Sequence, residues 1–210
     1  MNNLLVNFYI DKNESRNLEL ETCFVENLKN PSIDRIIMFC EQIDYDKIKE
    51  KYDLSKVTSI ITNKRPTYND YFALTKKEDI NIIANLDIII PKETLCQLKN
   101  YLNDKTCLAL SRWDLINDKI IHFNRIDSQD TWIFKNEVPH INGADFSLGI
   151  SGCDNSIAYL LEASGYNVIN PSKTIKTIHL HQSNVRNYIN NLGKVTQVIP
   201  PPYKLVIPTE

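Results

Sequence analysis

The chain has 210 residues, of which 42% are hydrophobic and 24% are charged, and its formal net charge is −2. This composition is typical of an ordinary globular protein, and the length is enough to bury a sizeable core in one large domain or two tight subdomains. Nucleic-acid binding needs a clustered basic face to neutralise phosphates, and the sequence shows none. We therefore expect no nucleic-acid partner.

The cysteines and the N-terminal residues bear on the cellular compartment. The five cysteines are odd in number and widely spaced, and no C-x-x-C pair indicates a zinc or redox motif, so we expect reduced, mostly buried thiols. The N-terminal residues lack both a basic region and an apolar stretch long enough for a signal peptide or a membrane anchor. We expect a cytoplasmic location and no membrane span.

In the first half, strand-like segments alternate with helical ones, which is typical of a mostly parallel sheet flanked by helices. The first helix is predicted from apolar residues that share one face, namely Leu18, Cys23, Phe24 and Leu28. The expected strands cover residues 4–10, 35–41, 57–63 and 79–90. The expected helices cover residues 15–30, 45–54 and 67–77.

The last of these strands is interrupted by Asn85-Leu86-Asp87. A carboxylate and an amide at the end of a buried strand are costly to place unless they meet a metal or a polar ligand. Side chains two apart in an extended chain share a face, so Asn85 and Asp87 are expected to reach one cation. A single carboxylate with phosphate oxygens suits Mg²⁺ or Mn²⁺. The alternative is an aspartate that caps a turn at the strand end.

A second polar cluster follows the third strand, in the segment TNKRPTYND. Cations beside a helix N-terminus suit a phosphate, and an aromatic ring with amide groups suits a nucleobase. The candidate residues are Lys64, Arg65, Tyr68, Asn69 and Asp70. Open sheets bind ligands at the carboxyl ends of their strands, so this cluster and residues 85–87 are expected to lie near one crevice. The alternative is a solvated basic turn that caps a helix.

The second half has shorter elements. We expect strands over 106–118 and 119–126 with a turn at Asn117-Asp118, and then a polar aromatic loop over 127–134. An amphipathic helix over 156–165 ends at Gly165, and two more strands cover 166–172 and 173–183. The proline-rich end, residues 195–210, is expected to be extended.

Two further clusters lie in this half. Asp154 stands where a helix begins, after a turn with Gly149 and Gly152, and a carboxylate held there suits a general base; the alternative is an N-cap. His179 and His181 share one face of a presumed strand, an arrangement often used for metal binding. For each histidine taken singly, a hydrogen-bonded core or surface role is the favoured alternative.

Taken in order, these clusters resemble the GT-A class of glycosyltransferases over nearly the whole chain. Asn85-Leu86-Asp87 is similar to the D-x-D motif, with Asn85 in place of the first acid, and Cys153-Asp154-Asn155 is similar to the E-D-D turn, with only the central acid kept. His181, or less clearly His179, is similar to the late histidine that completes the metal site in several members. The segments KRPTYND, LSRWD, SQDTWIF and GCDNSIAY also resemble transferases of large DNA viruses and bacterial surface-polysaccharide loci.

The resemblance implies an α/β fold with a single GT-A-like domain over 1–194 and a tail over 195–210. A Rossmann-like nucleotide-binding half would cover 1–92, and an acceptor half 93–194. It also implies a nucleoside-diphosphate sugar donor, foremost a UDP-sugar, and a Mn²⁺ or Mg²⁺ cofactor. The implied donor contacts are Lys64, Arg65, Tyr68, Asn69, Asp70, Asn85 and Arg186, and the implied metal ligands are Asp87, His181 and His179.

The activity that the resemblance implies is sugar transfer to a hydroxyl of a glycan or glycoconjugate, with Asp154 as the base of an inverting reaction. The implied acceptor contacts are Arg112, Trp113, Asp130 and Trp132. Either tryptophan is equally compatible with a place in the core. Two other classes remain open at this point, a metal-dependent nucleotidyltransferase and a non-catalytic module that binds a nucleotide or a glycan.

Overall fold

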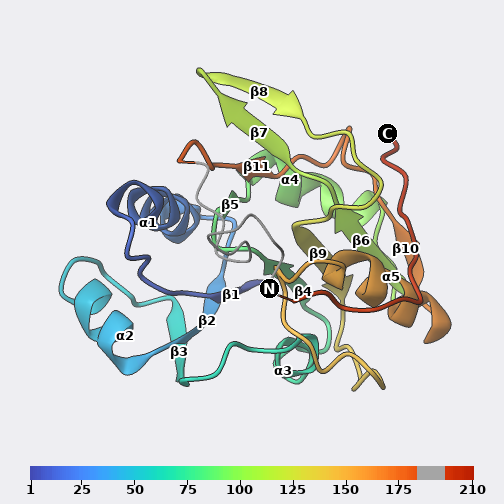
Figure 1. Ribbon diagram of the computed structural model, residues 1–210, viewed down its shortest axis with the longest axis horizontal. Helices are drawn as coiled ribbons and strands as arrows, with labels where there is room; N and C mark the ends of the chain where they lie inside the picture. The colour runs from blue at the N-terminus through green and yellow to red at the C-terminus, as the bar shows by residue number, and fades with distance from the viewer. Residues whose placement is uncertain (184–196) are drawn as a thin grey trace.

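A computed structural model describes residues 1–183 and 197–210 of the chain (Figure 1). Its centre is a seven-stranded sheet in the order β10-β6-β9-β4-β1-β2-β3. Neighbouring strands are parallel, except that β9 runs antiparallel to both β4 and β6. The seven strands are β1 Asn2–Asn7, β2 Arg35–Cys40, β3 Val57–Ile61, β4 Ile80–Ala84, β6 Thr106–Leu110, β9 Thr131–Lys135 and β10 Asn167–Ile169. The predicted α/β fold with a mostly parallel central sheet is confirmed.

Helices cover both faces of this sheet. They are α1 Glu14–Lys29, α2 Gln42–Lys49, α3 Tyr68–Phe72, α4 Lys92–Gln97 and α5 Cys153–Ala163, with a 3-10 turn, η1, at Leu98–Asn100. Because successive side chains of a strand point to opposite faces, Leu4 packs in a core with Phe24 of α1, while Leu5 packs in a second core with Ile157 of α5. Among the described residues, no helix combines the length and the apolar character needed to cross a membrane.

The predicted strand over residues 79–90 is two strands in two sheets. β4 ends at Ala84, a turn follows in which Ile88 N donates to Asn85 O at 3.2 Å, and β5 then joins a second sheet. This four-stranded sheet has the order β5-β11-β7-β8, with β5 Ile88–Ile89, β7 Trp113–Ile116, β8 Lys119–His122 and β11 Ile178–His179. The expectation that Asn85 and Asp87 share a face of an extended chain is therefore wrong.

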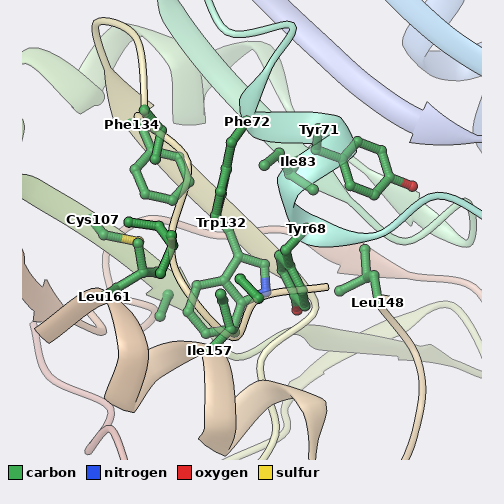
Figure 2. Close-up of a cluster of buried hydrophobic side chains, with 14 of the residues drawn as sticks. Tyr68, Tyr71, Phe72, Ile83, Cys107, Trp132, Phe134, Leu148, Ile157 and Leu161 are labelled. Carbon is green, nitrogen blue, oxygen red and sulfur yellow. The ribbon is translucent and has the colours of Figure 1, made fainter. Parts of the chain in front are cut away.

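The predicted polar loop over residues 127–134 is also wrong in its second part, because Thr131 begins the central strand β9. Figure 2 shows Trp132 of this strand inside the core, in one cluster with Tyr68 and with Ile157 and Leu161 of α5. A strand buried on both faces reads as a short apolar run without alternation, and this run is too short to separate from a loop. The predicted turn at Asn117-Asp118 is confirmed, and both residues have positive φ, at 48° and 60°.

The described part of the proline-rich tail packs on the domain. Ile199 N donates to Ser151 O at 2.8 Å, and Lys204 N donates to Asn155 O at 2.9 Å. Gly152 has φ 80°, and a Cβ there would lie 2.7 Å from Ile199 O, so only glycine allows this approach. The tail therefore wraps the first turn of α5, where Asp154 stands.

Candidate functional site

Three potential metal ligands meet where the two sheets join. Asp87 follows β4 in the turn to β5, His179 ends β11, and His181 lies two residues further on. One ligand atom from each of these residues lies within 4.8 Å of the others. The predicted metal set is thus brought together from positions about ninety residues apart in the sequence.

The Asp87 carboxylate is buried and heavily paired. Its Oδ2 accepts a hydrogen bond from the Arg16 guanidinium and lies 3.2 Å from His179 Nε2 and 3.8 Å from His181 Nδ1. Burial acts to raise the pKa of Asp87, but hydrogen bonds from His179 and His181 and the nearby Arg16 charge hold that pKa well below its usual value. Asp87 is therefore kept ionised, as a metal ligand must be.

The donor set fits a divalent cation. Within the part of the chain that the structure describes, Asp87 Oδ1 and His181 Nε2 are buried atoms without a hydrogen-bond partner. His179 Nδ1 lies 2.7 Å from Asp114 Oδ1. A carboxylate in this position orients a ligating imidazole, and here the His179 Nε2 points toward Asp87. Burial lowers the pKa of His179, but the Asp114 and Asp87 carboxylates raise it to about 9, so a cation must displace a proton there. Mg²⁺ prefers an all-oxygen ligand set, so two imidazoles beside one carboxylate fit a divalent transition-metal ion better than Mg²⁺.

The sequence predicts helix α1, but its role in supporting this cluster was not identified. Arg16 Nη1 donates to Glu19 at 3.0 Å, and Glu19 accepts the backbone N–H groups of Gln182 and Ser183 at 2.6 Å each. Helix α1 thereby fixes the chain just after His181. A signal was present, because Arg16 and Glu19 fall at helical spacing on the same buried face of α1 as Leu20.

A second corner of the site is formed by Asp154 in the first turn of α5. Gly152 is the N-cap residue of this helix, so the N-cap alternative for Asp154 is wrong. The carboxylate accepts the Gln129 backbone N–H at 3.3 Å and the Cys153 thiol at 3.2 Å. Burial and the charge of Asp130 raise the pKa of Asp154 to about 7. A carboxyl with this pKa can exchange a proton near neutral pH, as a general base must.

Asn85 and Asp130 lie between the two corners. Asn85 Nδ2 donates to Asp130 Oδ1 at 2.9 Å, and Arg112 Nη1 donates to Asp130 Oδ2 at 3.0 Å. The Asn85 side chain therefore faces Asp130. The first position of the D-x-D-like motif thus contacts the Asp154 side of the site.

Arg65 of the segment 63–70 and Asn85 of the segment 85–87 lie close to each other, on either side of Gly149. A Cβ built on Gly149 would lie 2.6 Å from Arg65 Nη2 and 3.6 Å from Asn85 Oδ1, so the side chains of Arg65 and Asn85 meet over this glycine. Gly149 has φ 75°, a conformation that favours glycine. Tyr9, just after β1, also borders the region: burial and the Asp87 charge raise the pKa of its hydroxyl. Sequence reasoning did not identify Tyr9.

Several predicted contacts lie elsewhere. Tyr68 and Trp132 are completely buried, with ring centroids 6.0 Å apart, so neither presents a face to a ligand (Figure 2). This corrects their assignment as nucleotide and acceptor contacts. Asp70 forms a capping box with Thr67, and Asn69 bonds to the backbone of Ile141 and to Asp145. Asp70 therefore has the helix-capping role of the alternative, and the Asn69 amide is engaged in bonds within the protein.

The other predicted contacts are more dispersed. Trp113 points to the opposite face of β7 from its neighbour Asp114, and its Nε1 donates to Ser172 O at 2.7 Å. Its ring packs against His122 and Lys176, on the face of the small sheet away from His179, which corrects its assignment as an acceptor contact. Lys64 is exposed beside Arg65. Arg186 lies outside the described residues.

Comparisons with known proteins agree with this architecture. No protein-family model matches the chain, and no curated protein does, so the resemblance to viral and polysaccharide-locus transferases stays a prediction. Among solved structures, the mannosyltransferase PcManGT from Pyrobaculum calidifontis, in complex with GDP-Man and Mn²⁺, matches with a TM-score of 0.54 and 12% identity. The match covers 89% of this chain but 58% of the mannosyltransferase.

Two nucleotidyl-type enzymes match more weakly. They are 4-diphosphocytidyl-2C-methyl-D-erythritol synthase from Anaerococcus prevotii, with a TM-score of 0.48, 14% identity and coverage of 88% and 89% of the two chains, and inositol-1-phosphate CTP transferase from T. maritima, with 0.46, 10%, 85% and 88%. At these identities the likeness shows the fold alone. The predicted GT-A-like α/β fold is confirmed, and the reaction is a matter for proposal.

Proposed function

We propose that this protein is a metal-dependent glycosyltransferase that moves a sugar from a nucleoside-diphosphate sugar to a hydroxyl of a glycan or other acceptor. The observation that carries the proposal is that Asp87 and Asp154, which are connected through Arg112 and its two carboxylate partners, have opposite electrostatic surroundings. Asp87 is kept ionised beside two histidines, while Asp154 has a pKa of about 7. The fold shared with a mannosyltransferase that binds GDP-Man and Mn²⁺ supports this reading.

In this proposal Asp87, His179 and His181 hold a divalent cation, preferably Mn²⁺. When bound, such a cation neutralises charge that develops on a diphosphate leaving group. Arg65 contributes a further positive charge at the edge of the crevice, next to the Gly149 turn that allows close approach. In this arrangement the nucleotide lies over the carboxyl ends of the strands of residues 1–92. The proposed enzyme is cytoplasmic and acts in glycan biosynthesis.

Asp154 is the proposed base. It accepts the proton of the acceptor hydroxyl as that oxygen attacks the anomeric carbon, which gives inversion in a single displacement. Residues 93–194 supply α5 and the Gln129 N–H that orients the carboxylate. Asp130, which adjoins both Asn85 and Asp154, is the member of the predicted acceptor set best placed to border the reacting groups.

A thermal-shift screen tests the proposal. The protein is heated with UDP-, GDP-, CDP- and dTDP-sugars, each with and without Mn²⁺. In the presence of Mn²⁺, a matching donor at 100 times its Kd is expected to raise the free energy of unfolding by about 2.7 kcal/mol and Tm by about 5 to 10 °C. Without Mn²⁺, the same donor is expected to leave both unchanged. His181→Ala is expected to abolish the shift, and the exposed His140→Ala is the matched control.

Product analysis separates the remaining classes. A glycosyltransferase releases a nucleoside diphosphate from the matching donor in the presence of an acceptor or, slowly, water. A nucleotidyltransferase instead releases pyrophosphate from a nucleoside triphosphate, and a binding module gives the thermal shift without either product. If none of the donors gave a metal-dependent shift in Tm, this result would contradict the proposed function.

A further inference from the structure

Arg112 lies where the chain leaves the large sheet for the small one, between the end of β6 at Leu110 and the start of β7 at Trp113. Its side chain is only 12% exposed, and its guanidinium carbon lies 4.0 Å from the centre of the Phe123 ring. Nε donates to Asp114 at 2.8 Å, and Nη1 donates to Asp130 at 3.0 Å. A single cation thus joins two carboxylates that come from different sheets.

The two carboxylates serve different corners of the crevice. Asp114 contacts His179 Nδ1 at 2.7 Å and so orients one of the three candidate metal ligands. Asp130 accepts the Asn85 amide at 2.9 Å and borders Asp154. Hydrogen bonds therefore connect His179 through Asp114 and Arg112 to Asp130, and the charge of Asp130 acts in turn on Asp154.

We propose that Arg112 is a positioning residue that holds the metal corner and the base corner in register, by binding Asp114 and Asp130 at once. The proposal rests on the proposed function, and it replaces the predicted role of Arg112 in acceptor binding. Only a planar guanidinium offers two donors in a fixed fork, so lysine, a point charge on a flexible stem, cannot hold both carboxylates in the same way. Without Arg112, Asp114 and Asp130 are two like charges left partly buried without this shared partner.

The metal side is tested by titrating Mn²⁺ alone into the wild-type protein and its variants, with calorimetry or electron paramagnetic resonance as the readout. Loss of a group that orients a metal ligand typically weakens affinity by 10- to 100-fold. We expect a loss in this range for Arg112→Gln and a smaller one for Arg112→Lys. In an Asp114→Asn background, Arg112→Gln is expected to add little, because its path to His179 is already broken.

Arg125→Gln is the matched control. Arg125 also stands near the Phe123 ring, at 5.8 Å, but it is 57% exposed and pairs with Asp127 on the surface. Its replacement is expected to leave Mn²⁺ affinity unchanged. If Arg112→Gln fails to fold, Arg112→Lys carries the test.

The base side is tested without metal, by ¹³C NMR titration of the Asp154 carboxyl group. The positive charge of Arg112 acts to lower the pKa of Asp154, so Arg112→Gln is expected to raise that pKa, and Arg125→Gln is not. Arg112 variants that melt at lower temperature but keep both the wild-type Mn²⁺ affinity and the wild-type Asp154 titration would overturn the proposal in favour of packing alone. A wild-type protein that does not bind Mn²⁺ would instead contradict the proposed metal site, and the Asp154 titration would still decide whether Arg112 acts on the base corner.

Discussion

Two aspartates of the candidate site, Asp87 and Asp154, have opposite electrostatic surroundings. Asp87 sits among Arg16, His179 and His181, and these partners hold its pKa well below the usual value. Asp154 is buried near another carboxylate, Asp130, and its pKa rises to about 7. The difference lies in the neighbours, since positive partners favour the charged form while burial and a like charge disfavour it. One aspartate is therefore suited to hold a cation and the other to exchange a proton.

The largest expected effect is that of Asp154→Asn on turnover. General-base catalysis contributes about 10²- to 10⁴-fold, so we expect sugar transfer to fall by that factor while metal-dependent nucleotide binding stays intact. Transfer assays and thermal shift with the matching donor measure the two quantities. Asp127→Asn, a surface aspartate paired with Arg125, is the control. Unchanged turnover would remove Asp154 as the base, and loss of folding would indicate a structural role in α5.

Asp87→Asn is expected to act on stability as well as on metal binding. Removing one partner of a buried ion pair typically costs about 3 to 5 kcal/mol, and here Arg16 would keep only Glu19 of its two carboxylate partners. Denaturant unfolding measures this loss, and a Mn²⁺ titration should show no binding. The control is Asp46→Asn, which breaks an exposed pair with Lys49 and is expected to leave stability unchanged. Equal stability of Asp87→Asn and wild type would show that the metal corner is not held together by these charges.

The pH dependence distinguishes the corners further. The pKa of Asp154 is raised in the folded state, so its contribution to stability is complete below the unfolded pKa near 4 and is lost as pH rises through about 7. We expect Asp154→Asn to gain stability relative to wild type between pH 5 and pH 8, by a few kcal/mol at most, in denaturant unfolding at both values. Transfer by the wild type is expected to rise with pH through about 7. A stability difference that does not change with pH would contradict the raised pKa.

The sequence predicts well those elements that depend only on residues close together in the chain. β1, α1 and β2 follow from regular spacing of apolar residues, which depends on neighbours in the chain. Asp87 was singled out because a carboxylate at the end of a buried strand is costly without a partner. Asp154 was singled out because it follows a glycine turn at a helix start, and the two histidines because they share one face of a strand. Residues that act through distant partners are harder to find. The ion pair of Arg16 with Asp87 spans 71 residues, and only folding brings those side chains together.

The errors have physical causes as well. β9 was missed because its five residues enter the middle of the sheet with both faces covered, so the run lacks the alternation of a half-exposed strand. Trp132 was consequently expected in a binding loop and is instead fully buried. The segment Asn85–Asp87 was expected to be extended, with a turn as the alternative, and the structure has the turn. Nothing local shows that the strand after this turn joins a different sheet.

The smallest expected effect is that of a substitution at Asp70. Among the described residues this carboxylate bonds only to the N-cap residue of its own helix, so its variant is compared with those of Asp87 and Asp154. Its side chain accepts the Thr67 backbone N–H and hydroxyl at 2.8 Å each, and closes the capping box of α3. Asp70→Ala is expected to cost about 1 kcal/mol in denaturant unfolding and to leave donor binding unchanged. Arg65→Gln in the same segment is expected to weaken donor binding and to leave the free energy of unfolding unchanged, because Arg65 is exposed and borders the Gly149 turn. If Asp70→Ala weakened donor binding as much as Arg65→Gln, the segment would contact the nucleotide along its whole length, and its carboxylate would belong with those of the crevice.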